Sequence, residues 1–161
     1  MSSLFNPDKT LYSIDASSLI EAYHSYPFDI FPTLWEKLEA LIKEDRLKMF
    51  EYVYDIEVKD EELIDWCEEN NLKPYLRATI DQVDQKKAQA LSPLLVNPDT
   101  GESGGDPWVI ALAQELPNGV VVTQEKASRN KDYPKIPNVC SDLEIECIDL
   151  IGLFRKENWT F

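Results

Sequence analysis

Residues Leu11 to Asp15 read LYSID and run directly into ASSLIEAYHSY at residues 16–26. The first stretch is a short apolar run that ends in an acid, and the second begins with residues that cap helices well, Ser17 or Ser18. Together they predict a buried strand that leads straight into a helix. A second buried strand is indicated by GVVVT at residues 119–123, because β-branched residues favour strands.

Strand-like and helix-like patterns alternate along the rest of the chain. The expected elements are an amphipathic helix over 32–43, a short strand over 47–50, one or two helices over 53–70, a helical stretch over 75–95, a helix with Asp106 as N-cap and Pro107 at its first position, a short helix around 139–143, a strand over 145–148 and a helix from Asp149. Such alternation predicts a three-layer α/β/α fold with a central, mainly parallel sheet.

The chain of 161 residues, 43% of them hydrophobic, fits a single domain over residues 1–161, with residues 1–10 as a loose lead-in. No basic segment followed by an apolar stretch opens the sequence, and the longest apolar runs are too short to cross a bilayer. A cytoplasmic protein without a membrane partner is therefore expected. Its three cysteines show no CxxC spacing, which favours reduced, packed thiols over a zinc site.

The charge balance constrains any function that involves nucleic acid. With 30 acidic and 16 basic residues the formal net charge is −14, which repels polyanions at long range. Such a balance suits a binder of calcium or magnesium, a partner with a basic face, or simply a solubilising surface. One locally basic stretch contains a single acid, Asp132, and is either a solvated loop or a contact for phosphates; its basic residues are Lys126, Arg129, Lys131 and Lys135.

Acids follow the expected strands at places that a parallel sheet brings together. Asp15 ends the first strand, and Glu125 lies two residues beyond the strand at 119–123. Asp106 opens a helix after the glycine-rich loop NPDTGESGG, and Glu57 lies early in the helix expected after the second strand. Functional sites of open parallel sheets lie outside the carboxyl ends of the strands, so the four side chains are expected to converge there.

Converging carboxylates repel one another, so such a cluster is normally stabilised by a cation. Magnesium and manganese prefer oxygen ligands and bind carboxylates together with phosphate oxygens. The simpler interpretations are a helix cap for Asp106, a turn for Asp15, a solvated helix residue for Glu57 and a loop acid for Glu125.

His24 is the only histidine, and no GxSxG, Walker A or GxGxxG pattern is present.

The sequence resembles the PIN domain family in four segments that follow the family's order. YSIDASSLI is similar to the first-strand aspartate motif, GGDPWVIALA to the helix-start aspartate motif and VVTQEK to the strand-end motif of threonine and acid. VYDIEV matches the intermediate glutamate motif more loosely, and Asp55, Asp60, Glu61 and Glu62 compete with Glu57 there. The tail IPNVCSDLEIECIDLIGLF is similar to the end of a small bacterial branch of the family.

This resemblance implies a PIN-like α/β/α domain with a magnesium- or manganese-dependent endoribonuclease activity, in which Asp15, Glu57, Asp106 and Glu125 bind the metal and Ser17 is a polar neighbour. It also implies a toxin of a toxin–antitoxin pair, with RNA as substrate, an antitoxin protein as partner and a homodimer. The family usually has aspartate at the fourth position, where Glu125 has one more methylene group. Two alternatives therefore stay open: a PIN-like binding module without catalysis, and a nuclease for DNA or for RNA processing.

Overall fold

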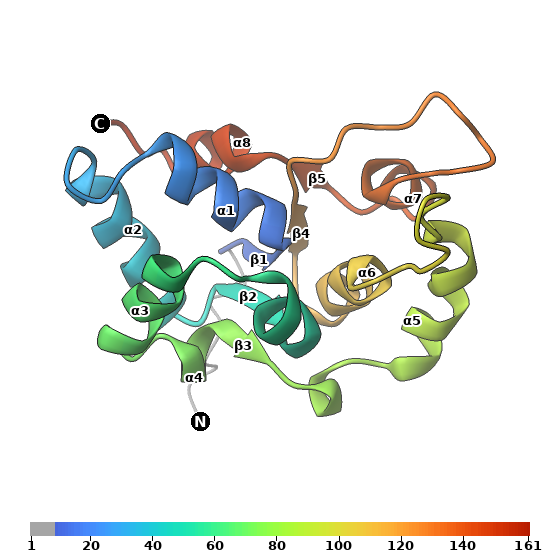
Figure 1. Ribbon diagram of the computed structural model, residues 1–161, viewed down its shortest axis with the longest axis horizontal. Coiled ribbons are helices and arrows are strands. Elements are labelled where there is room, and N and C mark those ends of the chain that lie inside the picture. The colour runs from blue at the N-terminus through green and yellow to red at the C-terminus, as the bar shows by residue number, and fades with distance from the viewer. Residues whose placement is uncertain (1–8) are drawn as a thin grey trace.

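A computed structural model describes residues 9–161, which form one central sheet of five parallel strands with the order β3-β2-β1-β4-β5 (Figure 1). The strands are β1 (Leu11–Ile14), β2 (Leu47–Phe50), β3 (Arg77–Ala78), β4 (Gly119–Val122) and β5 (Cys147–Ile148). Every neighbouring pair is parallel. The expected parallel sheet is confirmed, and all four residues of β1 are buried because this strand lies at its centre.

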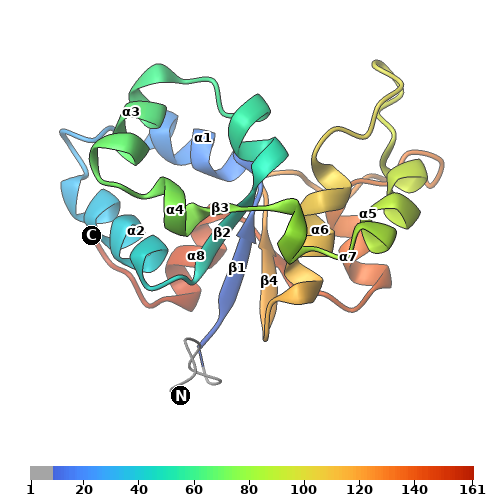
Figure 2. The ribbon, with the colours of Figure 1, turned by 90° about the horizontal axis from the view of Figure 1, so that it is seen from below.

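The helical elements cover both faces of this sheet. They are α1 (Ala16–Ser25), α2 (Pro32–Lys43), η1 (Val53–Glu57), α3 (Glu61–Glu69), α4 (Lys73–Leu76), η2 (Ile80–Gln82), α5 (Gln85–Leu91), η3 (Ser92–Leu95), α6 (Asp106–Glu115), α7 (Ile136–Asp142) and α8 (Leu150–Lys156). Figure 2 shows α1, α2 and α8 on one side of the strands, and α5, α6 and α7 on the other. The three-layer α/β/α prediction is therefore confirmed.

The pairing register sets which residues leave the sheet together. Ile14 pairs with Val122 across β1 and β4, and the backbone N–H of Asp15 donates to the carbonyl oxygen of Val122 at 2.8 Å. Asp15 and Thr123, the residues that follow these two strands, consequently emerge side by side at the carboxyl edge of the sheet.

Two expected helix starts are wrong. The N-cap of α1 is Asp15 and neither Ser17 nor Ser18, although the Asp15 side chain makes no capping bond. The N-cap of α6 is Gly105, whose carbonyl oxygen accepts from the N–H groups of Trp108 (3.0 Å) and Val109 (3.1 Å). Asp106 is therefore the first helical residue, and its carboxyl group is not used as a cap.

The helical stretch expected over residues 75–95 is also wrong, because the chain there is divided into five short pieces. Thr79 and Gln82 form a reciprocal capping box at the start of η2, and Asp84 caps the start of α5 through a bond from the N–H of Lys86. These local side-chain bonds compete with a continuous helix. The strand β3, which the apolar spacing did not indicate, lies inside this stretch.

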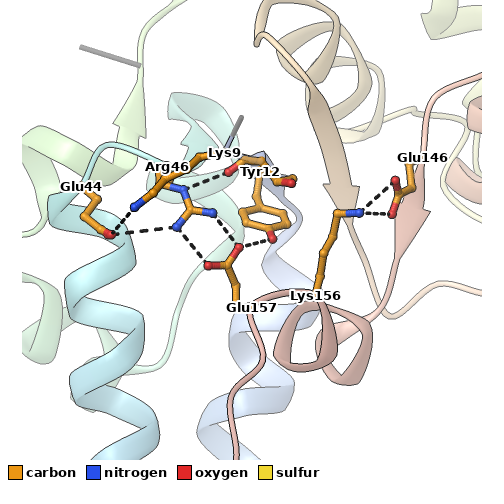
Figure 3. A network of polar contacts seen from close by, with 8 residues as sticks. Lys9, Tyr12, Glu44, Arg46, Glu146, Lys156 and Glu157 are labelled. Carbon is orange, nitrogen blue, oxygen red and sulfur yellow. Dashed lines mark hydrogen bonds and ion pairs between the residues drawn. The ribbon is translucent and has the colours of Figure 1, made fainter. Parts of the chain in front are cut away.

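At the amino ends of the strands, acids are matched with cations (Figure 3). Arg46 makes two hydrogen bonds to Glu157, at 2.9 and 2.6 Å, and the hydroxyl of Tyr12 donates to the same carboxylate. Lys156 pairs with Glu146 at 2.9 Å. This edge of the sheet is thus closed by charge-assisted bonds that attach the end of α8 to β1.

Two further expectations concern cysteines and membranes. Cys67 and Cys140 are buried, Cys147 is half-buried, and all three are free thiols. Within residues 9–161 no helix has the length and apolarity needed to cross a membrane. Most of the lead-in expected over residues 1–10 lies outside the described residues.

Candidate functional site

Asp15 is a buried carboxylate held in place by two hydroxyl groups. It is 5% exposed, and its Oδ2 accepts from the Oγ of Ser17 at 2.8 Å and from the Oγ1 of Thr123 at 2.9 Å. Burial raises the pKa of Asp15, while these two bonds and one from the Ala16 N–H lower it. The predicted role of Ser17 as a polar neighbour therefore has a direct geometric basis.

Glu57 comes from a different kind of helix than expected. It is the last residue of η1, a five-residue π-helix that follows β2, and does not lie early in a longer α-helix. Single π-helical turns are often found at functional sites. Burial raises the pKa of Glu57 most, the charge of Asp15 raises it further, and a bond from the Gly105 N–H lowers it.

Three of the four competitors of Glu57 are engaged elsewhere, and the fourth, Glu61, is exposed at the start of α3. Asp55 accepts two bonds from Arg77, at 3.0 and 2.7 Å, and Glu62 accepts from the hydroxyl of Tyr23 at 2.9 Å. Asp60 lies 3.9 Å from the Nε2 of His24. Among these acids, Glu57 is the one whose charge interacts with Asp15.

Asp106 has a strongly perturbed carboxyl group. Burial, followed by the charges of Glu125, Asp15 and Glu57, raises the pKa of Asp106 to about 8, and the nearby Lys135 opposes this rise. Without a cation, Asp106 is therefore protonated over much of the neutral range. Its place at the first residue of α6 follows from the preceding turn, where Gly104 has a φ of +56°.

Glu125 lies just beyond β4, and one of its two carboxylate oxygens has no hydrogen-bond donor within the described residues. The Ile136 N–H donates to its carboxylate, but its Oε2 is buried and has no hydrogen-bond partner within the described residues. Burial raises the pKa of Glu125 most, and the charge of Asp15 adds to the effect. A buried carboxylate oxygen without a donor is costly and invites a cation or a proton.

The four acids form one electrostatic neighbourhood at the carboxyl edge of the sheet. Asp106 interacts with the other three, Glu57 interacts with Asp15 and Glu125, and the pKa of every member is raised. Within residues 9–161, however, no three or more His, Cys, Asp or Glu side chains are arranged as a ready group of metal ligands. Like charges without a counter-ion are expected to stay apart, so a bound cation would have to draw the side chains together.

A cavity of about 330 Å³ adjoins Asp106 and Glu125. One wall is the chain from Leu95 to Asp99, before α6, and the other is the loop between β4 and α7. That loop, which Figure 1 shows extending away from the sheet, contains the four predicted basic residues. Only Lys135 of these four lines the cavity and interacts with the acids, whereas Lys126, Arg129 and Lys131 are exposed elsewhere on the loop.

Sequence reasoning missed two residues that organise the site. Thr123 donates to Asp15, and its Oγ1 accepts from the N–H of Glu125 at 3.2 Å, so it joins two of the acids. Gln124 accepts from the Oγ of Ser18 and from the Leu150 N–H, which fixes the start of the loop against α1 and α8. The sequence signals were the threonine of the strand-end motif and the position of both residues between β4 and Glu125.

Fold and site together define an α/β/α protein with a carboxylate cluster at the carboxyl ends of parallel strands. The chain belongs to the family described as "Domain of unknown function (DUF4411)", which matches residues 12–161 and so includes every residue of this site. No curated protein and no solved structure matches the chain.

Proposed function

We propose that the protein is a divalent-metal-dependent endoribonuclease of the PIN-like type, which hydrolyses RNA phosphodiester bonds in the cytoplasm. The observation that supports this best is the convergence of Asp15, Glu57, Asp106 and Glu125, which come from four separate segments. At the opposite edge of the sheet the acids are paired with Arg46 and Lys156, whereas Lys59 and Lys135, which interact with this cluster, make no close ion pair among residues 9–161. A cluster left without paired cations is expected to take one from solution.

The donor set fits magnesium or manganese. All four groups are hard oxygen donors, and the buried, unpartnered Oε2 of Glu125 offers a ligand atom at little additional desolvation cost. Asp15 keeps one oxygen that accepts neither from Ser17 nor from Thr123. When bound, such an ion would lower the pKa of a water and stabilise charge on the phosphate.

The protein's own residues contribute orientation and charge. Ser17 and Thr123 fix the Asp15 carboxylate, and the Gly105 and Ile136 N–H groups do the same for Glu57 and Glu125. The ammonium group of Lys135 is placed to contact a phosphate that approaches the acids. Positioned side chains of this kind contribute to catalysis because they need little reorganisation during the reaction.

The decisive experiment is cleavage of a mixed pool of structured and unstructured RNA by purified protein with manganese, with magnesium and with chelator. Single-stranded DNA is treated in parallel to test the alternative substrate. We expect metal-dependent RNA cleavage that is lost in Asp15→Asn and Asp106→Asn. The matched control is Asp142→Asn, an exposed acid at the end of α7.

Activity retained in Asp15→Asn and Asp106→Asn would point to a contaminating nuclease, and loss of activity in the control as well would point to misfolding. A folded wild type that cuts no nucleic acid under any of these conditions would overturn the proposal.

A partner protein is the second part of the proposal: a toxin controlled by a basic antitoxin, and forming a homodimer as in similar PIN-like proteins. Two adjoining cavities of about 360 and 440 Å³ share Phe28 and Glu62, and their walls come from α1, the segment that follows it and α3. Aromatic and acidic side chains alternate around them: Tyr23, Asp29, Asp65, Trp66 and Glu69. Such a surface suits arginine or lysine side chains through cation–π contacts and charge.

The same surface supports the alternative of a PIN-like binding module without catalysis. The two functions separate in one measurement, since Asp15→Asn abolishes cleavage by a nuclease but leaves the partner affinity of a binding module unchanged.

A further inference from the structure

The cavity beside Asp106 and Glu125 has a lining that the four acids do not explain. Its volume of about 330 Å³ is at the lower end of the range for small-ligand sites, about 300–1,000 Å³. Apolar, amide and cationic groups line it beside Asp106 and Glu125, and one further acid, Asp99, lies at the end of the Leu95–Asp99 wall. A site that served a metal ion alone would need none of the other walls.

One wall offers a flat surface. Tyr133 and Pro134 line the cavity, and the side chain of Tyr133 is 46% exposed although it is a large aromatic group. Leu95 and Val96 lie on the opposite chain segment and add apolar surface. An exposed aromatic ring that borders a partly apolar cavity can serve as a platform for a stacked base, since every base has a π-face.

The amide groups give the cavity free hydrogen-bond donors. The Oδ1 of Asn97 accepts from the Asp99 N–H at 2.8 Å, and the Oδ1 of Asn130 accepts from the Asp132 N–H at 3.0 Å. These bonds fix which end of each amide is the oxygen. Within the described residues, neither Nδ2 donates to a protein group, so both remain available to the edge of a ligand.

Beside the aromatic, apolar and amide groups, the cavity has a cation. Lys135 lines the cavity and is close enough to Asp106 and Glu125 to offset part of their charge. A ligand with a flat polar ring at one end and a phosphate at the other would meet the aromatic wall, the amides and Lys135 together. We propose that this cavity binds one unstacked nucleobase of a single-stranded RNA, with its phosphate against Lys135, next to the bond that is cut.

This inference rests on the proposed ribonuclease function for its biological meaning, but the binding can be measured without cleavage. Nucleoside 5′-monophosphates are titrated into isotopically labelled protein in the presence of chelator, and dissociation constants are obtained from amide chemical shifts. Ribose 5-phosphate, which lacks the base, is the ligand control. We expect shifts around Asn97 and Tyr133 with the nucleotides, and much weaker binding of ribose 5-phosphate.

Variants separate stacking from charge. Because base–aromatic stacking is a substantial part of such affinity, Tyr133→Ala should weaken nucleotide binding by about 5- to 100-fold, whereas Tyr133→Phe should retain it within about twofold. Tyr75→Ala is the matched control, since that tyrosine is similarly exposed but lies on α4. Lys135→Ala should weaken binding of the monophosphate more than that of the parent nucleoside, with Lys131→Ala as its control.

The outcomes distinguish the two proposals. Nucleotides that bind as expected to a protein that cuts no RNA would support the cavity and overturn the nuclease. Metal-dependent cleavage with an unchanged KM in Tyr133→Ala, or nucleotide binding unaffected by this substitution, would overturn the cavity and leave the nuclease standing. Chemical shift changes confined to the two adjoining cavities around Phe28 would also overturn it. Circular dichroism verifies that each variant is folded.

Discussion

The carboxyl group of Asp106 lies near three other acids and is largely removed from water, so its pKa rises to about 8. An unfolded chain loses this proton near pH 3.9. Between these values the folded state holds a proton that the unfolded state has released. The contribution of Asp106 to stability is therefore complete at low pH and is lost as the pH rises through about 8.

Asp106→Asn removes the ionisable group that destabilises the folded state at higher pH. In chelator at about pH 8, we expect the free energy of unfolding to rise by roughly 1–3 kcal/mol, and by less at about pH 5. Urea unfolding at the two pH values measures the difference. The exposed control Asp142→Asn should change stability by less than about 0.5 kcal/mol. A destabilised Asp106→Asn protein at the higher pH would contradict this account of the site.

Gly105 supports Glu57 by having no side chain. A Cβ atom there would lie 2.5 Å from the Cγ2 of Val53 and 2.8 Å from the Oε2 of Glu57. We expect Gly105→Ala to lower the free energy of unfolding by about 1–3 kcal/mol and to reduce metal-dependent cleavage, because Val53 and Glu57 must shift. Thermal unfolding and the RNA assay check this, with Glu102→Ala in the same loop as control. Unchanged stability would mean that Val53 and Glu57 can move at little cost, and would contradict this prediction.

For single residues, the sequence predicted a place in the site when the residue lies next to a strand or helix that was itself predicted. Asp15 and Asp106 were identified from the strand or helix beside them, and Glu57 was chosen from five acids by its position. Thr123 was missed because its role depends on the pairing of β1 with β4. A hydroxyl that bonds to a residue 108 positions away leaves no local pattern.

Among the elements, η1 is a π-helix and is tied to β3 by side-chain bonds. Arg77 at the start of β3 makes two hydrogen bonds to Asp55 and approaches Glu51 at 3.5 Å. We expect Arg77→Met to cost only about 0.5–1 kcal/mol, because the pair is partly exposed. Its main effect should be faster hydrogen exchange of the amides in η1 and weaker cleavage through a less fixed Glu57.

Lys87→Met is the matched control, since it breaks the exposed pair with Glu115 on the other side of the sheet. Equal exchange rates in η1 for the two variants would show that the tie does not order this segment.

Regular elements with a single pattern were predicted well, and mixed stretches were not. The helix Pro32–Lys43 and the strands β1, β2 and β4 agree with the apolar spacing. The chain from Tyr75 to Leu95 also has a helical stripe, but Thr79 and Asp84 use their side chains to start separate short helices there. Two-residue β3 was not visible, because a strand of this length has no periodicity.

For the whole molecule, the net charge of −14 should govern how it meets RNA. We expect kcat/KM to rise as the ionic strength increases from about 0.01 M to 0.1 M at constant metal concentration, because the Debye length falls from about 30 Å to 10 Å and long-range repulsion is screened. The rise should be smaller for the wild type than for Lys135→Gln, which lacks the local attraction. A steep fall with salt would show instead that basic contacts dominate.

The overall architecture was the most predictable property, because alternating strands and helices have few ways to pack. The chemistry of the carboxyl edge was predictable only as a set of nearby acids. The cavity was not, since its walls come from two loops whose contact depends on the fold as a whole.

The strand order has a consequence for the way in which the chain is made. A ribosome synthesises β1, β2 and β3 first, and these strands form one half of the sheet with Asp15 and Glu57 at its edge. The other half of the acids, and the hydroxyl of Thr123 that orients Asp15, are added only with α6 and β4. A nascent chain thus holds no complete carboxylate cluster until Glu125 has left the ribosome, so the proposed ribonuclease would be harmless to the messenger and the ribosomal RNA during most of its own translation.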